Sequence, residues 1–302
     1  MVIMLAADRL FFYFFSKTIF SKTLSGESGG SVNYLIQKKK NIDFIILGSS
    51  RAKHHINPAL LTNVYAGNGY NAGINGKGGL MYNSMLLELL VAKRIIPKLV
   101  ILQFDPYPYL LAKDENTDRE VSQLYPFIDE AATLKASIKK NTGFTEKAKL
   151  FLHCYRFNGK LLNILFNYTK RNTTAANNGF EGLSGKLDSS SFAITNNLIA
   201  KYDYSPVKLN SLVDIIKTCR TNNTRLVMIF PPYYRNSALY EQQNHMISTL
   251  IQKHAAVKIL DFSALERYPS LQPAAMWKDE GHLNNEGAAV FSRMINDSLA
   301  NF

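Results

Sequence analysis

Four short, mostly apolar runs constrain the fold of this 302-residue chain more than any other feature. They lie at 42–47, 98–104, 225–230 and 257–262. Continuous apolar runs of this length are typical of strands that are covered on both faces. Apolar residues recur at helical spacing between and after the runs, at 79–94, 207–221, 237–254 and 285–299. Strands that alternate with helices favour right-handed crossovers, so the predicted fold class is α/β, a three-layer sandwich around a parallel sheet.

One segment, at about 107–205, interrupts this alternation. It is rich in Tyr, Lys and Asn, and contains one clear helical stretch near 145–168. We interpret it as a helical insertion within a single α/β domain that spans 41–302. Insertions at the carboxyl edge of such a sheet lie over the ligand crevice. A surface subdomain with no part in the site is the alternative, and the sequence leaves both open.

The N-terminal 40 residues are predicted to be an apolar segment followed by a linker. Residues 1–15 are strongly apolar and aromatic, but Asp8 and Arg9 interrupt them. The stretch is too short and too charged to be a complete transmembrane helix. We favour the trailing end of a membrane anchor, because aromatic residues gather at membrane interfaces. The alternative is an amphipathic helix that packs on the domain.

The formal net charge of +12 bears on the choice of partner. Most basic residues are scattered, and the sequence lacks zinc-finger spacing and RNA-binding aromatic signatures, which disfavours nucleic acid. A basic face suits anionic glycans, a phospholipid surface or simple solubility. Cys154 and Cys219 lie in apolar helical contexts, so we expect two free thiols. No metal is expected, and the absence of phosphate-loop and dinucleotide glycine patterns predicts no cofactor.

Two distant motifs can supply a Ser-His-Asp triad. Gly48-Ser49-Ser50 follows the first strand, where a serine at a strand-to-helix turn is exposed over the sheet edge. Asp279 and His282 are three residues apart before the last helix, so both side chains point to one side. The carboxylate would orient the imidazole, whose other nitrogen takes the serine proton. Taken singly, each motif is also compatible with an ordinary loop or a surface histidine.

A glycine-rich loop at 71–79 is the third candidate element. Its glycines permit tight turns and close approach of the backbone, so an N–H from it can stabilise a developing oxyanion. A flexible connection between strand and helix is the alternative.

Together these motifs resemble SGNH/GDSL-type hydrolases. Gly48-Ser49-Ser50-Arg51, the Gly76 loop and Asp279-Glu-Gly-His282-Leu-Asn284 occur in the family order, and the likeness covers about 40–105 and 207–300. The resemblance implies a flavodoxin-like sheet, with Ser50 as nucleophile, His282 as base and Asp279 as its orienter. Ser50 is preferred over Ser49 because it matches the third position of the family's Gly-Asp-Ser block. The oxyanion hole would use the backbone amides of Ser50 and Gly76.

One position departs from the family pattern. Where the family has Gly-x-Asn-Asp, this chain has Gln103-Phe-Asp105-Pro106. Asparagine donates a hydrogen bond to the oxyanion and an ionised aspartate cannot, a loss of typically about 10²–10³ in rate. Asp105 therefore points elsewhere, is held protonated by burial, or marks a weak site or one dedicated to another acceptor.

The expected function is that of a serine esterase or O-acyltransferase acting on acyl, above all acetyl, esters of a carbohydrate or cell-envelope polymer. The expected location is extracytoplasmic, in the periplasm or at the cell surface, with membrane association through the N-terminus. Arg51 and Asn75 are predicted to contact substrate, and Tyr107 and Tyr233 to stack on sugar rings. Proline-tyrosine turns that merely cap strands are the alternative for both tyrosines.

Two other functions stay open at this point. A catalytically degraded relative could serve as a glycan-binding or assembly factor, which Asp105 favours and the intact Ser50, Asp279 and His282 disfavour. A cytosolic lipase or thioesterase would need an apolar acyl pocket, and the Asn-rich insertion offers no obvious one.

Overall fold

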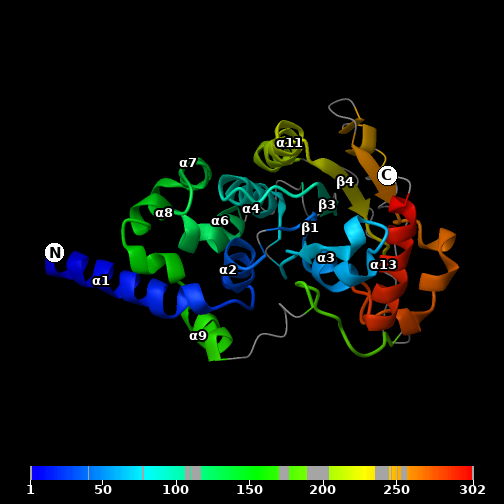
Figure 1. Ribbon diagram of the computed structural model, residues 1–302, viewed down its shortest axis with the longest axis horizontal. Coiled ribbons are helices and arrows are strands. Elements are labelled where there is room, and N and C mark those ends of the chain that lie inside the picture. Colours follow the sequence, from blue (N-terminus) through cyan, green and yellow to red (C-terminus); the bar gives the residue numbers. More distant parts are fainter. Residues whose placement is uncertain are drawn as a thin grey trace.

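The centre of the computed structural model is a parallel sheet of five strands in the order β2-β1-β3-β4-β5 (Figure 1). The strands are β1 Phe44–Leu47, β2 Gly69–Asn71, β3 Leu99–Gln103, β4 Arg225–Phe230 and β5 Lys258–Asp261. Helices cover both faces, so the predicted three-layer α/β sandwich is confirmed. The structure describes residues 2–39, 41–76, 78–105, 110, 117–169, 177–188, 204–234, 245, 247–249, 251–252 and 257–300.

Alternation along each strand sends neighbouring side chains to opposite layers. Ile45 and Leu47 pack into a core cluster with α4 (Leu80–Ala92) and α11 (Pro206–Thr221). Phe44 and Ile46 pack into a second cluster with α13 (Asn285–Leu299). Every residue of β1 and β3 is buried, which explains why both sequences are apolar apart from Gln103 at the end of β3.

Strand β2 is the sheet element that the sequence analysis missed. It has three residues, Gly69-Tyr-Asn, with only one large apolar side chain among them. It pairs with β1 on the side opposite to β3, so the strand order reverses direction between β1 and β3. In open α/β sheets, ligands bind outside the carboxyl ends of the strands at that position. This edge carries α3 (Ser50–His55), which begins directly after β1.

The insertion forms a helical lobe beside one end of the sheet layers (Figure 1). Its described elements are α6 Thr117–Val121, η4 Ser122–Phe127, α7 Ala132–Asn141, α8 Phe144–Lys149, η5 His153–Phe157 and α9 Leu161–Thr169. The helix predicted over 145–168 is therefore three shorter pieces. Gly159, with φ of +68°, ends the regular backbone before α9. The predicted helix at 237–254 lies largely outside the described residues.

The N-terminal segment packs on this lobe through its first helix. It consists of α1 Val2–Thr18, η1 Phe20–Lys22 and α2 Gly30–Gln37. Phe12 and Phe15 contact the ring of Phe157. Among the described residues, no helix is both long and apolar enough to cross a bilayer.

Short 3-10 helices complete the chain: η2 Pro58–Leu60, η3 Tyr65–Gly67, η7 Leu265–Arg267, η8 Pro269–Leu271 and η9 Ala274–Met276. The two cysteines are free, as predicted. Burial raises the pKa of Cys219 to about 12. Burial and a hydrogen bond to Asp8 raise the pKa of Cys154 to about 11. Neither thiol is therefore poised as a nucleophile.

Candidate active site

Ser50 is the first residue of α3, immediately beyond the turn that ends β1. Gly48 adopts φ of +149° in this turn, and a Cβ there would lie 2.7 Å from Gln103 Oε1. Ser49 caps the helix, because its hydroxyl accepts the Arg51 N–H and donates to Gln103 Oε1 at 3.0 Å. The glycine and the cap together aim the next side chain, Ser50, away from the sheet core and over its edge.

A continuous hydrogen-bonded chain joins Ser50 to the tail of the protein. Ser50 Oγ lies 2.9 Å from His282 Nε2. The other ring nitrogen, Nδ1, lies 2.9 and 3.1 Å from the two carboxylate oxygens of Asp279. A carboxylate accepts, so Nδ1 carries the proton and Nε2 is left to accept the serine hydroxyl proton. This is the tautomer that a general base needs.

The turn that carries His282 is held by several local bonds. Asp279 Oδ1 accepts the Gly281 N–H at 2.8 Å, while Trp277 and Leu283 form an antiparallel bridge. Asn284 then caps α13 by accepting two N–H groups of its first turn. The Asp-x-x-His spacing therefore works here because a tight turn, and not a helix, brings the two side chains together.

All three side chains of this hydrogen-bonded series are partly open to solvent. Side-chain exposure is 29% for His282 and 51% for Asp279. Ser50 is half-buried. The reacting atoms are thus accessible to an external substrate, and the exposed Asp279 orients the imidazole more than it stabilises its charge, because water screens the pair.

Asp105 lies in a buried ion pair with Arg51. Its Oδ1 is 2.6 Å from Arg51 Nη1 and accepts the Tyr233 hydroxyl at 2.6 Å, while Oδ2 accepts Gln103 Nε2–H at 2.7 Å. The carboxylate is only 3% exposed. Of the three outcomes expected for Asp105, this geometry fits the first, a side chain turned to another partner. As an acceptor in all three contacts, Asp105 supplies no donor to an oxyanion hole.

Arg51 connects the loops around the site and does not face the solvent. It is 5% exposed. Besides Asp105, its guanidinium donates to the carbonyl oxygens of Gly281 and Pro232, both at 3.0 Å, and stacks on the Tyr233 ring at 3.5 Å. The structure therefore gives Arg51 a positioning role where the sequence analysis expected a substrate contact. Arg51, Asp105 and Tyr233 form one buried cluster, which we call the Arg51 brace. The stacking of Tyr233 on sugar stays a prediction. Tyr107 lies outside the described residues.

The glycine-rich loop packs directly against the serine turn. Ile74 N–H donates to Gly48 O, and a Cβ at Gly78 would lie 2.3 Å from the same oxygen. Gly76 adopts φ of +60° and is exposed beside these contacts. The close approach of the two backbones explains the glycine at 78, and the positive φ explains the glycine at 76. The contacts with Gly48 put the loop within the site.

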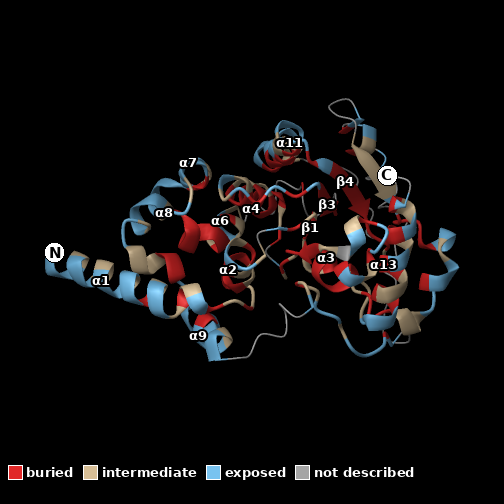
Figure 2. Cartoon of the chain, in the orientation of Figure 1, coloured by how far each residue is buried: buried red, intermediate tan, exposed pale blue. Residues whose placement is uncertain are grey.

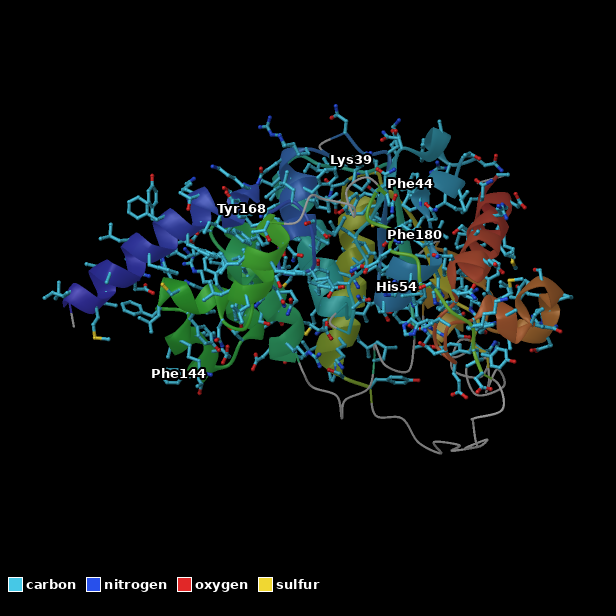
Figure 3. All side chains as sticks on the ribbon, turned by 90° about the horizontal axis from the view of Figure 1, so that it is seen from below. Lys39, Phe44, His54, Phe144, Tyr168 and Phe180 are labelled. Atoms are coloured by element: carbon cyan, nitrogen blue, oxygen red, sulfur yellow. The ribbon has the colours of Figure 1, made fainter. Side chains whose placement is uncertain are left out.

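Four residues that the sequence analysis did not select hold this loop. Glu27 accepts the Asn75 N–H at 2.8 Å and pairs with Lys53 at 2.7 Å; Lys53 also pairs with Glu181 at 2.8 Å. His54, the fourth, projects from α3 near Phe180 (Figure 3). Glu27 comes from the N-terminal segment, and no local pattern links it to a loop 48 residues away.

His54 fixes the side chain of Asn75. Its Nδ1 faces the main-chain carbonyl of Glu181, so that nitrogen carries a proton. Nε2 lies 2.8 Å from the Asn75 side-chain oxygen. This contact is favourable when His54 is doubly protonated, or when the Asn75 carboxamide turns by 180° and donates its N–H. In either state the Asn75 side chain is engaged inside the protein, whereas the sequence analysis expected it to contact substrate.

His55 lies beneath the histidine turn. It is fully buried, and its Nε2 accepts the Leu283 N–H at 3.0 Å. Burial, and then the positive charge of Arg51, lowers its pKa well below 6.5. His55 is thus a neutral side chain that supports the turn next to His282.

Across the residues with a described placement, no cluster of His, Cys, Asp or Glu is arranged to hold a metal ion. The comparisons with known proteins add no identity. No protein-family model matches the chain, and no curated protein matches it. The candidate active site therefore rests on its own geometry.

Proposed function

We propose that this protein is an SGNH-type serine esterase or O-acyltransferase that acts on acyl esters of a carbohydrate or cell-envelope polymer. One observation carries the proposal. Ser50 and His282 are 232 positions apart in the sequence, yet their side chains form a 2.9 Å hydrogen bond with Asp279 behind the imidazole. Serine with a hydrogen-bonded histidine and an orienting carboxylate is the arrangement of nucleophilic acyl transfer.

The reaction would proceed in two halves. His282 Nε2 removes the Ser50 proton while Oγ attacks the acyl carbon, and the imidazolium then protonates the departing sugar oxygen. This leaves an acyl group on Ser50. Water or another sugar hydroxyl, deprotonated by His282, attacks the acyl-enzyme and restores the serine. Asp279 keeps the imidazole in the productive tautomer throughout.

Backbone amides would stabilise the oxyanion. The amide of Ser50 lies at the start of α3, and the amide of Gly76 lies in the loop packed against the serine turn. The Asn75 amide is bonded to Glu27, so it is not a third donor. Because Asp105 is paired with Arg51, we expect a turnover rate about 10²–10³ lower than that of a site with a side-chain donor to the oxyanion.

The polymer substrate and the extracytoplasmic location are the less direct parts of the proposal. Support comes from the net charge of +12, which suits an anionic envelope polymer, and from tyrosines after the ends of two strands. The half-exposed triad is also compatible with a large substrate.

A fluorophosphonate probe tests the nucleophile directly, with a matched control next to it. Ser50→Ala should abolish labelling, while Ser49→Ala should retain it, because the Ser49 hydroxyl bonds to Gln103 and not to the histidine. Turnover of p-nitrophenyl acetate and acetylated sugars should follow the same pattern. Equal labelling of the wild type and Ser50→Ala would defeat the proposal.

A second function is favoured by Asp105 alone. On this alternative, a protein without an oxyanion side-chain donor keeps the sheet as a glycan-binding or assembly factor. This alternative predicts no labelling of any variant and unchanged glycan binding by Ser50→Ala.

A further inference from the structure

The polarity of helix α1 is the reverse of that of a helix on a water-soluble surface. Of residues 2–16, only Asp8 and Arg9 are charged, and both contact the helical lobe, with side chains that are 9% and 39% exposed. Asp8 accepts the N–H groups of His153 and Cys154 at 2.8 and 2.9 Å, while Arg9 donates to Phe151 O. The charges are therefore used to attach α1 to the helical lobe.

The opposite face of α1 is apolar. Ile3, Leu10 and Phe14 are 84%, 58% and 59% exposed, and their spacing of seven and four residues puts them on one stripe. Other exposed residues widen it: Val2, Met4, Phe11 and Tyr13. A surface helix normally turns its apolar stripe inward. A contiguous apolar patch of this kind marks an interaction surface.

Figure 2 shows α1 as a largely exposed helix that extends from the helical lobe, away from the sheet. Phe151, 62% exposed, lies beside it, because Arg9 sits over its ring at 5.5 Å. Phe144 is excluded, since Figure 3 places it at the far edge of the lobe from α1. We call the stripe and its flanking residues the α1 face: Val2, Ile3, Met4, Leu10, Phe11, Tyr13 and Phe14.

Charge indicates what covers the α1 face. Residues 2–22 carry Arg9, Lys17 and Lys22 against Asp8 alone. An apolar stripe with basic flanks matches an anionic lipid surface, where lysines meet headgroups and apolar side chains enter the acyl boundary. A second copy of the chain would instead bring two basic surfaces together.

We propose that the α1 face lies in the interface of an anionic phospholipid bilayer, with the helix along the membrane surface. Phe11, Tyr13 and Phe14 supply the aromatic residues that such interfaces favour. The N-terminal segment also holds the active-site loop through Glu27, so membrane attachment and the site share one structural unit. The inference does not depend on the reaction proposed for Ser50.

Vesicle co-sedimentation of the full chain tests it, with equimolar phosphatidylglycerol/phosphatidylcholine against phosphatidylcholine alone. Ile3→Ser/Leu10→Ser/Phe14→Ser removes the stripe. The matched control, Ile96→Ser/Val207→Ser/Phe144→Ser, changes exposed apolar residues elsewhere, which are 47%, 41% and 87% exposed. Wild type and control should bind the anionic vesicles, and the stripe variant should partition at least about tenfold less. High salt should weaken wild-type binding.

Circular dichroism establishes that the variants are folded, which is expected because every changed side chain is exposed. Absence of wild-type binding, or equal binding by the stripe variant, would overturn the proposal. Light scattering tests whether the α1 face binds a second copy of the chain. A wild-type dimer that the stripe variant abolishes, with no vesicle binding by the wild type, would assign the α1 face to a second copy instead.

Discussion

Replacement of Asp105 by asparagine should destabilise the protein strongly although the side chains have nearly the same shape. The change removes the buried carboxylate that pairs with the buried Arg51 guanidinium. Removal of one partner of a buried ion pair typically costs about 3–5 kcal/mol, because the remaining charge is left uncompensated. Arg51 keeps the carbonyls of Gly281 and Pro232 and the Tyr233 ring, so we expect the lower end, about 3 kcal/mol.

Urea unfolding followed by circular dichroism measures this loss. The series is the wild type, Asp105→Asn, Arg51→Met and the double variant, and the double variant should lose less than the sum of the two single changes, because it leaves no unpaired charge. Glu130→Gln is the matched control, an acid-to-amide change in the exposed pair with Lys93, and should cost less than about 1 kcal/mol. An unchanged midpoint in Asp105→Asn, or strict additivity, would refute the buried brace.

The Asp105→Asn variant also distinguishes a structural role of Asp105 from a role in the oxyanion hole. If position 105 reached the oxyanion, an asparagine there would add a donor and raise kcat by about 10²–10³. We expect no gain, and a modest loss, because Arg51 also holds the carbonyl of Gly281 next to His282, the proposed general base. A faster Asp105→Asn enzyme of normal stability would contradict the role assigned to Arg51.

Two further changes test the surroundings of the site. His55→Gln should flatten the pH dependence of unfolding free energy between pH 7.5 and 5.5. The folded pKa of His55 lies well below 6.5, so the unfolded chain takes up a proton first and stability falls as the pH drops, by up to about 1.4 kcal/mol per unit. Parallel slopes for variant and wild type in urea titrations would count against it. Glu27→Gln keeps an acceptor for the Asn75 N–H but loses the Lys53 pair. We expect kcat to fall roughly tenfold with little change in KM, short of the ~10²-fold of a 1 Å displacement. The control is Glu181→Gln, which also loses a Lys53 pair, and an equal fall in that variant would indicate a general effect of Lys53.

The fold could be predicted from the sequence because the pattern that indicates each buried strand is local. A strand buried on both faces is mostly apolar, and β1, β3 and β4 show this apart from Gln103 and Arg225 at strand ends. The serine turn and the Asp-x-x-His turn are equally local, since glycine and short spacing dictate their geometry. Strand β2 escaped prediction because three residues give no periodicity, and its pairing with β1 alone defines it.

Contacts between distant segments were decided only by the tertiary structure. The sequence contains Arg51, Asp105 and Glu27, but not the fact that the first two meet as a buried pair or that the third reaches the Asn75 loop. The same holds for α1. Its apolar composition could be read from the sequence, whereas the contacts of Asp8 and Arg9 depend on the lobe that offers them partners. Local patterns specify elements, because neighbours in sequence share a face, and only packing determines which charges become buried and which apolar side chains stay outside.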